Sequence, residues 1–161
     1  MPGPTKSTRL IRTAATDLLA DGEAVEVGLR VMLKQVAYNS GVASARSVSG
    51  ALGSFAADRA NERIRNEQDR AEATGLPTAP RMGYGLTDRR ILVWTLDTWS
   101  NKPDAFIGSI ALTDLASVTF QKGLLFGRLT LTRRAGHDLT LDVARVEKGR
   151  AFADALSARL G

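Results

Sequence analysis

The sequence predicts a mainly β fold of the α+β class, in which seven antiparallel strands form a small split barrel that a C-terminal helix closes. Short segments with alternating apolar residues follow one another from residue 82 onward, separated by turn-forming residues. Their connections are too short for parallel crossovers, so consecutive strands are expected to be antiparallel neighbours. The last segment, residues 145–160, instead shows apolar residues at helical spacing and predicts a capping helix.

The composition is that of a globular protein and argues against several kinds of site. A chain of 161 residues fits one domain, and 43% hydrophobic and 24% charged residues are ordinary values. Cysteine is absent, which removes disulfides, thiol catalysis and Cys-ligated zinc, and the one histidine is too few for a His-rich metal site. We therefore expect no metal and no cofactor. With no signal peptide and no apolar run of membrane-spanning length, we expect a cytoplasmic protein.

The net charge of +5 is compatible with phosphates, anionic lipid or acidic proteins as partners. No block of five or six like charges occurs in the sequence, so we favour a solvated basic surface as the plainer explanation.

Two elements are expected before the main run of strands. Residues 7–20 have an amphipathic helical pattern, and Ser7 or Thr8 is expected to cap the helix by accepting from its first N–H groups. Residues 21–22, Asp-Gly, end it. Residues 23–34 alternate as a strand.

A long helical insertion, residues 38–76, is predicted between the first strand and the second. Its second half, 58–74, is strongly charged, and Gly75 and Pro77 stop the helix. We expect residues 40–75 to serve as an accessory helix that contacts a protein partner or a second copy of the chain. Deleting 38–76 is expected to leave a folded barrel.

The remaining strands are expected at 82–87, 91–97, 105–112, 117–121, 128–133 and 138–143.

Four segments of this chain, in this order, resemble the bacterial PH-like group, near GRAM-like domains. They are LADGE at 19–23, LTDRRILV at 86–93, IALTDLASV at 110–118 and KGRAFADAL at 148–156. The resemblance covers roughly 20–34 and 82–160. It implies a seven-stranded, strongly bent sheet whose one end a terminal helix closes. Such domains are mostly non-catalytic and bind phosphoinositides, other lipid head groups or peptides.

The chain departs from that group at the loop between the first two strands. Lipid-binding PH domains hold phosphates there with lysines and arginines, whereas this chain carries the insertion. Arg30 and Lys34 end the first strand, but no compact basic cluster follows them. Lys34 is kept as a candidate contact, and phosphoinositide binding is not assigned.

Three further residues are candidate ligand contacts: Arg89, Arg90 and Trp99. Arg89 and Arg90 could present two guanidinium groups to a phosphate. We favour the plainer interpretation, in which Asp88 caps the turn and both arginines are exposed hairpin residues. Trp94 lies in the middle of a strand and is expected in the core, whereas Trp99 lies in a loop and is the exposed candidate.

The loop at residues 122–128 is the most unusual candidate. Large apolar residues, including Leu125 and Phe126, lie between two glycines, and Lys122 and Arg128 flank them. An apolar tip with a basic rim is typical of a membrane-inserting loop, which would place the protein peripherally at the inner membrane face. We favour the alternative that Leu125 and Phe126 fold back to fill the barrel mouth.

These observations favour a non-catalytic PH-like module that binds a protein partner or a membrane surface. The alternative from another class is binding of nucleic acid or another anionic ligand. A small hydrolase or isomerase that uses the barrel mouth is the third hypothesis, although His137 and Asp138 are not a catalytic set without a nucleophile. The arginines of the second hypothesis are Arg89, Arg90, Arg128, Arg133 and Arg134.

Overall fold

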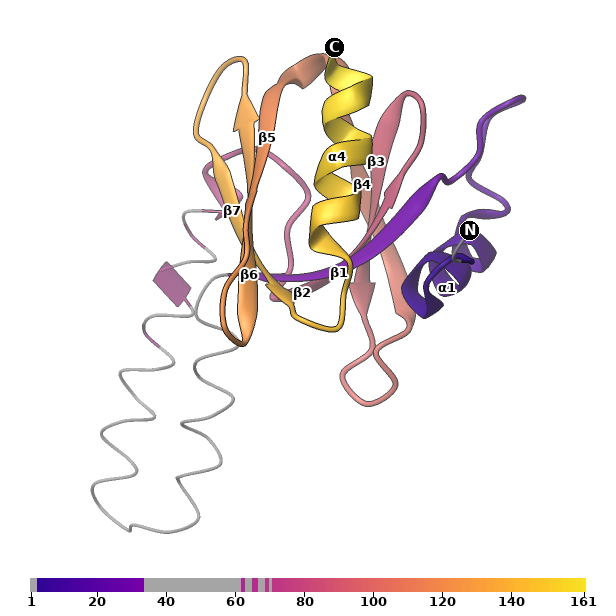
Figure 1. Ribbon diagram of the computed structural model, residues 1–161, viewed down its shortest axis with the longest axis horizontal. Helices are drawn as coiled ribbons and strands as arrows, with labels where there is room; N and C mark the ends of the chain where they lie inside the picture. Colours follow the sequence, from indigo (N-terminus) through magenta and orange to yellow (C-terminus); the bar gives the residue numbers. More distant parts are fainter. Residues whose placement is uncertain (1–2, 34–61, 63–64, 67–68, 70) are drawn as a thin grey trace, which may run out of the picture.

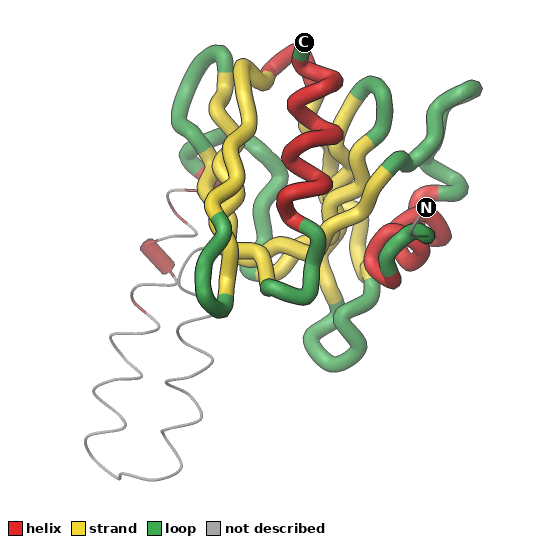
Figure 2. Tube along the Cα trace, in the orientation of Figure 1, coloured by secondary structure: helices red, strands yellow, loops and turns green. Residues whose placement is uncertain are grey.

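The computed structural model describes residues 3–33, 62, 65–66, 69 and 71–161 of the chain. In this part of the chain seven strands form one antiparallel sheet in the order β4-β3-β2-β1-β7-β6-β5 (Figures 1 and 2). The elements are α1 (Lys6–Ala15), β1 (Val27–Leu33), β2 (Arg81–Leu86), β3 (Arg90–Leu96), β4 (Pro103–Ala111), the 3-10 turn η1 (Leu112–Asp114), β5 (Leu115–Gln121), β6 (Phe126–Arg133), β7 (Leu139–Ala144) and α4 (Gly149–Leu160).

Strand β1 joins the two halves of the sheet. It pairs with β2 from Val27 to Met32, but it pairs with β7 only at Met32 and Leu33. This short pairing lets the two halves of the sheet, β1–β4 and β5–β7, diverge. Helix α4 lies across the opening and packs against β5, β1 and β6 (Figure 1). The predicted seven strands and capping helix are therefore confirmed.

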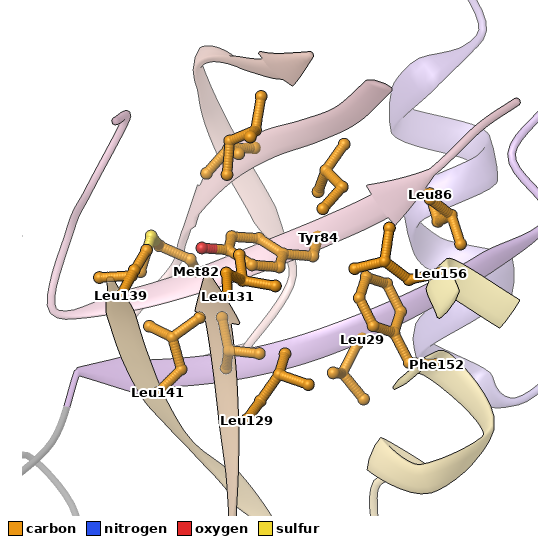
Figure 3. Packing of buried hydrophobic residues seen from close by; sticks show 14 of the residues in the cluster. Leu29, Met82, Tyr84, Leu86, Leu129, Leu131, Leu139, Leu141, Phe152 and Leu156 are labelled. Carbon is orange, nitrogen blue, oxygen red and sulfur yellow. The ribbon is translucent and has the colours of Figure 1, made fainter. Parts of the chain in front are cut away.

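The core lies between the two halves of the sheet and α4 (Figure 3). Alternate residues of the strands point inward, as the period of two requires. Tyr84 of β2 and Phe152 of α4 meet here, with ring centroids 6.3 Å apart. The fully buried side chains around them include Leu29, Met82, Leu86, Leu129, Leu131, Leu141 and Leu156.

Helix α1 packs on the outer face of β1 and β2, where a row of glycines leaves room for its close approach. A Cβ atom at Gly28 would lie 2.9 Å from the Cδ1 atom of Ile11, and one at Gly85 would lie 2.8 Å from its Cγ2 atom. Ile11 is buried by this close approach, next to Trp94 of β3. The expectation that Trp94 belongs to the core is confirmed.

The N-terminal boundaries differ from those predicted. Thr5, and neither Ser7 nor Thr8, caps α1: its Oγ1 accepts from the backbone N–H of Thr8 at 3.1 Å. The helix ends at Ala15 rather than at residue 20. Strand β1 begins at Val27 because side chains, rather than a complete strand ladder, hold residues 23–26.

Helix α4 begins at Gly149 rather than at residue 145. Residues 145–148 form a connecting segment instead, and the backbone N–H of Arg145 donates to the carbonyl of Leu125 at 3.2 Å.

Most of the predicted insertion, and Lys34, lie outside the described residues. The C-terminal end of the insertion, residues 71–76, is described. Ala71 and Leu76 are buried there in the main core. Deleting 38–76 would therefore remove two core side chains. That the deletion leaves a folded barrel stays a prediction.

Candidate functional site

The turn between β2 and β3 is a structural anchor. The Nε and Nη2 groups of Arg90 donate to the two carboxylate oxygens of Glu23 at 2.9 and 3.0 Å, and Nη2 also donates to the carbonyl of Leu18 at 2.9 Å. The Glu23 side chain is almost fully buried. The guanidinium group of Arg90 is therefore occupied by Glu23. Arg90 is not an exposed turn residue, and it is not free to contact a ligand.

Thr87, not Asp88 as predicted, organises this turn. The Thr87 hydroxyl accepts from the backbone N–H groups of Arg89 and Arg90, both at 3.1 Å. It lies 2.8 Å from a carboxylate oxygen of Glu23, to which it donates. The hydrogen bonds from Arg90, with those from the Ala20 N–H and Thr87, lower the pKa of Glu23 to about 2 despite its burial. The segments 19–23 and 86–93 thus form one buried polar junction.

Of the two arginines in this turn, Arg89 alone is exposed as predicted. Its Nη2 group donates to the carbonyl of Asp21 at 3.3 Å, and its Nε atom lies 3.8 Å from Asp88.

Exposed apolar side chains gather at one end of the barrel. We call this end the loop end and define it by the β3–β4 turn (97–102), the β5–β6 turn (122–126) and the β7–α4 connection (145–148) (Figure 1). Within the described part of the chain, six large apolar side chains are exposed, and five of them belong to these loops. They are Trp99 (95% exposed), Leu124 (85%), Val146 (83%), Leu125 (71%) and Phe126 (36%).

The three loops lie together in space. The β5–β6 turn and the β7–α4 connection share the hydrogen bond from Arg145 to Leu125. Asn101, Phe126 and Val146, one from each loop, line the same open hollow of about 340 Å³. Leu125 and Phe126 do not fill the barrel mouth, since they are 71% and 36% exposed. The interpretation that we favoured for this loop is therefore wrong, and the exposed tip is the arrangement found.

The β3–β4 turn holds Trp99 in its exposed position. One carboxylate oxygen of Asp97 accepts from the backbone N–H groups of Trp99 (3.0 Å) and Ser100 (2.8 Å) and from the Ser100 hydroxyl (3.0 Å). These bonds favour the ionised carboxylate and lower the pKa of Asp97. Asn101 completes the turn with a left-handed backbone, φ 55°. Trp99 is exposed as predicted.

Cations surround the apolar residues of the loop end. Lys122, Arg128, Arg145 and Lys148 are exposed, and none of them makes an ion pair with another described residue. The one acidic residue of the β7–α4 connection, Glu147, pairs with a cation of β1 instead. It accepts from Arg30 Nε at 2.6 Å and from the Ser7 hydroxyl at 2.9 Å. The loop end therefore combines an apolar centre with a rim in which cations outnumber the acidic residues Asp97 and Glu147.

The arginines proposed for nucleic-acid contact do not form one surface. Arg133 and Arg134 lie at the β6–β7 turn, at the opposite end of strand β6 from the loop end. Arg133 donates to the carbonyl of Thr74, and Arg90 is bound to Glu23. Arg128 lies in β6, next to the loop end.

Catalytic and metal-binding chemistry find no support in the described part of the chain. His137 is exposed in the β6–β7 turn, and no group of three or more acidic or histidine residues there could hold a metal ion. In the same part of the chain, no helix has the length and apolar character needed to cross a membrane.

Sequence reasoning named Trp99, Lys122, Leu125 and Phe126 of the loop end and the neighbouring Arg128, but it did not name Leu124, Arg145, Val146 or Lys148 as contacts. Leu124 belongs to the same glycine-bounded turn, so the run of apolar residues at 124–126 could have identified it. Val146 was assigned to the capping helix, where a lone apolar residue carries no signal of its own.

Comparison with known proteins shows the fold. A pleckstrin homology domain from Shewanella amazonensis superposes with a TM-score of 0.54 at 8% identity, over 100% of this chain and 94% of that one. The Vps36 N-terminal PH domain also matches, at 24% identity over 50% of this chain and 62% of that one, with a TM-score of 0.39. No family model and no curated protein matches the chain. The protein therefore has a PH-like fold, as its four sequence segments predicted.

Proposed function

We propose that this PH-like chain is a non-catalytic binding module that docks its loop end on an anionic membrane surface. The observation that carries the proposal is the gathering of Trp99, Leu124, Leu125 and Val146, all more than two thirds exposed, on three adjoining loops. Exposed apolar patches of this kind are typical of interaction sites, because water-exposed apolar area is costly.

The physical chemistry of the patch favours a membrane over a protein groove as the partner. A leucine side chain that leaves water contributes about 1.5–3 kcal/mol, so two leucines at a tip supply a useful fraction of a docking energy. Each lysine or arginine near an anionic leaflet adds about 1 kcal/mol. Trp99 has the aromatic side chain that is enriched at the boundary between head groups and acyl chains. The three parts of the site are thus matched to the three layers of a membrane interface.

Vesicle co-sedimentation tests this proposal. We expect the full chain to pellet with vesicles of phosphatidylcholine mixed with phosphatidylglycerol, and to stay in the supernatant with phosphatidylcholine alone. Leu125→Asp should weaken the pelleting about tenfold or more, because it replaces an inserted apolar group by a carboxylate. Ala135→Asp introduces the same charge in the exposed β6–β7 turn and should pellet like the unmodified chain.

Two results would oppose the proposal. Equal and negligible pelleting with both vesicle types would exclude membrane docking and leave a protein partner as the role of the loop end. Equal loss of pelleting in Leu125→Asp and Ala135→Asp would show that overall charge, rather than the loop end, determines binding. Nucleic-acid binding is measured separately at low salt, where phosphate contacts are strongest.

A further inference from the structure

A separate pocket opens beside the loop end, between the β5–β6 hairpin, the end of β7 and the first turn of α4. Its volume is about 480 Å³, which is within the range of about 300–1,000 Å³ typical of sites for small ligands. Phe120, Val143 and Ala144 form its apolar wall, together with the backbones of three glycines. None of the exposed tip residues Leu124, Leu125 and Phe126 lines it.

Glycines keep the aromatic wall of this pocket in place. A Cβ atom at Gly127 would lie 2.4 Å from the Phe120 ring, and a Cβ atom at Gly149 would also lie 2.4 Å from it. The ring is therefore held in a slot between β6 and α4. The guanidinium carbon of Arg150 lies 5.4 Å from the ring centroid, so a cation stands over this aromatic surface.

The rim of the pocket is positive. Lys122, Arg145, Lys148 and Arg150 all line it, and none of them forms an ion pair with another described residue. Two acidic residues also line the pocket. Glu147 is engaged by Arg30 and Ser7, and Asp154 lies beyond the first turn of α4. That first turn contains no acidic residue and no side-chain cap, so the positive end of the helix dipole adds to the four cations.

An apolar wall below a cationic rim is complementary to a ligand with an acyl chain and an anionic head. Inorganic anions would leave the apolar wall unfilled, and a neutral amphiphile would leave four cations unpaired. We propose that this pocket binds one acyl chain carrying a carboxylate or phosphate head, with the chain against Phe120, Val143 and Ala144 and the head among Lys122, Arg145, Lys148 and Arg150. This inference rests on the proposed docking of the loop end, which would bring the pocket mouth to the membrane that supplies such a lipid.

Calorimetric titration of the full chain with soluble probes tests the pocket without any membrane. The probes are dodecanoate, the uncharged amphiphile dodecyl maltoside, acetate and inorganic phosphate, the two amphiphiles below the concentrations at which they form micelles. We expect saturable binding of one dodecanoate per chain. We expect dodecyl maltoside, acetate and phosphate each to bind at least about tenfold more weakly.

Substitutions then place the bound molecule. Ala151 is exposed on α4 and lines the pocket, so Ala151→Leu fills it while keeping a good helix former. We expect Ala151→Leu to abolish dodecanoate binding. Lys122→Glu with Lys148→Glu should weaken binding about tenfold or more, whereas Arg134→Glu in the β6–β7 turn should leave binding unchanged. Thermal unfolding of each variant shows that it is folded, and the double variant decides the question if Ala151→Leu is not.

The two proposals can fail separately. Leu125→Asp lies outside the pocket, so it should lose vesicle pelleting and keep dodecanoate binding. The pocket proposal is overturned if the unmodified chain does not bind dodecanoate, if dodecyl maltoside or phosphate binds as tightly, or if the folded Ala151→Leu variant binds dodecanoate normally. None of these results depends on whether the chain pellets with vesicles.

Discussion

At the scale of single residues, the buried carboxylate of Glu23 depends on the guanidinium group of Arg90. Two hydrogen bonds join the groups, and Thr87 supplies a third to the carboxylate. Removing one partner of a buried ion pair typically costs about 3–5 kcal/mol, because the other charge then has no compensation. Arg90, which we expected to be an exposed hairpin residue with phosphate contact as the alternative, is therefore a stabilising residue.

The same pair gives the protein an acid-sensitive contribution to stability. The pKa of Glu23 is about 2 in the folded protein, below its ordinary value of 4.5, so the carboxylate favours the folded state when ionised. The contribution is complete above pH 4.5 and is lost as the pH falls toward 2. We predict that the difference in unfolding free energy between the unmodified chain and Glu23→Gln shrinks across this interval. Urea unfolding at several pH values measures it, and a difference that stays constant below pH 4.5 would contradict this assignment.

At the scale of elements, the position of α1 depends on glycines in β1 and β2. Gly28, Gly83 and Gly85 form a flat surface, and Ile11 rests on it. Arg12 then ties the helix to the carbonyls of Val25 and Glu26 at 2.9 and 3.0 Å. The glycines of the segment Gly83-Tyr84-Gly85 thus have a packing role, while Tyr84 points into the core.

Gly85→Ala tests whether close packing on the glycines positions α1. Its added methyl group would meet Ile11 at 2.8 Å and Trp94 at 3.2 Å, and overpacking of this kind costs about 1–3 kcal/mol. We predict faster amide hydrogen exchange in α1 and a lower urea midpoint. Gly3→Ala, with open space around its Cβ, is the control and should behave like the unmodified chain. Equal exchange of α1 in both variants would show that the close approach is unimportant.

Local patterns predicted the elements whose sequence signals lie within one short segment. Alternation and turn residues specify seven strands, since both are properties of neighbouring residues. The boundaries at 20, 23 and 145 were wrong because distant contacts set them: Glu23 bonds to Arg90, and Arg145 bonds to Leu125. The burial of Leu76 is also a long-range effect, and charge patterning in the insertion gave no sign of it.

For the candidate site, the sequence identified the residue types but not how they are arranged. Trp99 and Leu125 were recognised because an exposed aromatic or a glycine-bounded apolar turn is visible in one segment. Their gathering with Val146 was not visible, since the three loops are distant in sequence. The pocket beside Phe120 was missed for the same reason: its walls come from β5, β6, β7 and α4.

At the scale of the whole molecule, the residues that stabilise the fold and those that we propose to bind a membrane lie in different regions. The β2–β3 turn and α1 are held by buried polar bonds and close packing. The loop end carries the exposed apolar residues and cations that form no ion pair with another described residue. The PH-like fold suits this division, because a bent sheet closed by a helix can present loops without depending on them for its core. The central claim is that the loop end enters a membrane interface.

Trp99 supplies the most direct measurement of that claim. It is 95% exposed, whereas the other tryptophan, Trp94, is 3% exposed, so a change in tryptophan emission on binding reports on Trp99. The account predicts that adding phosphatidylglycerol-containing vesicles shifts the emission to shorter wavelength and protects Trp99 from quenching by iodide, and that Trp99→Phe removes both effects. An emission spectrum and quenching that stay unchanged when the protein is saturated with these vesicles would contradict it.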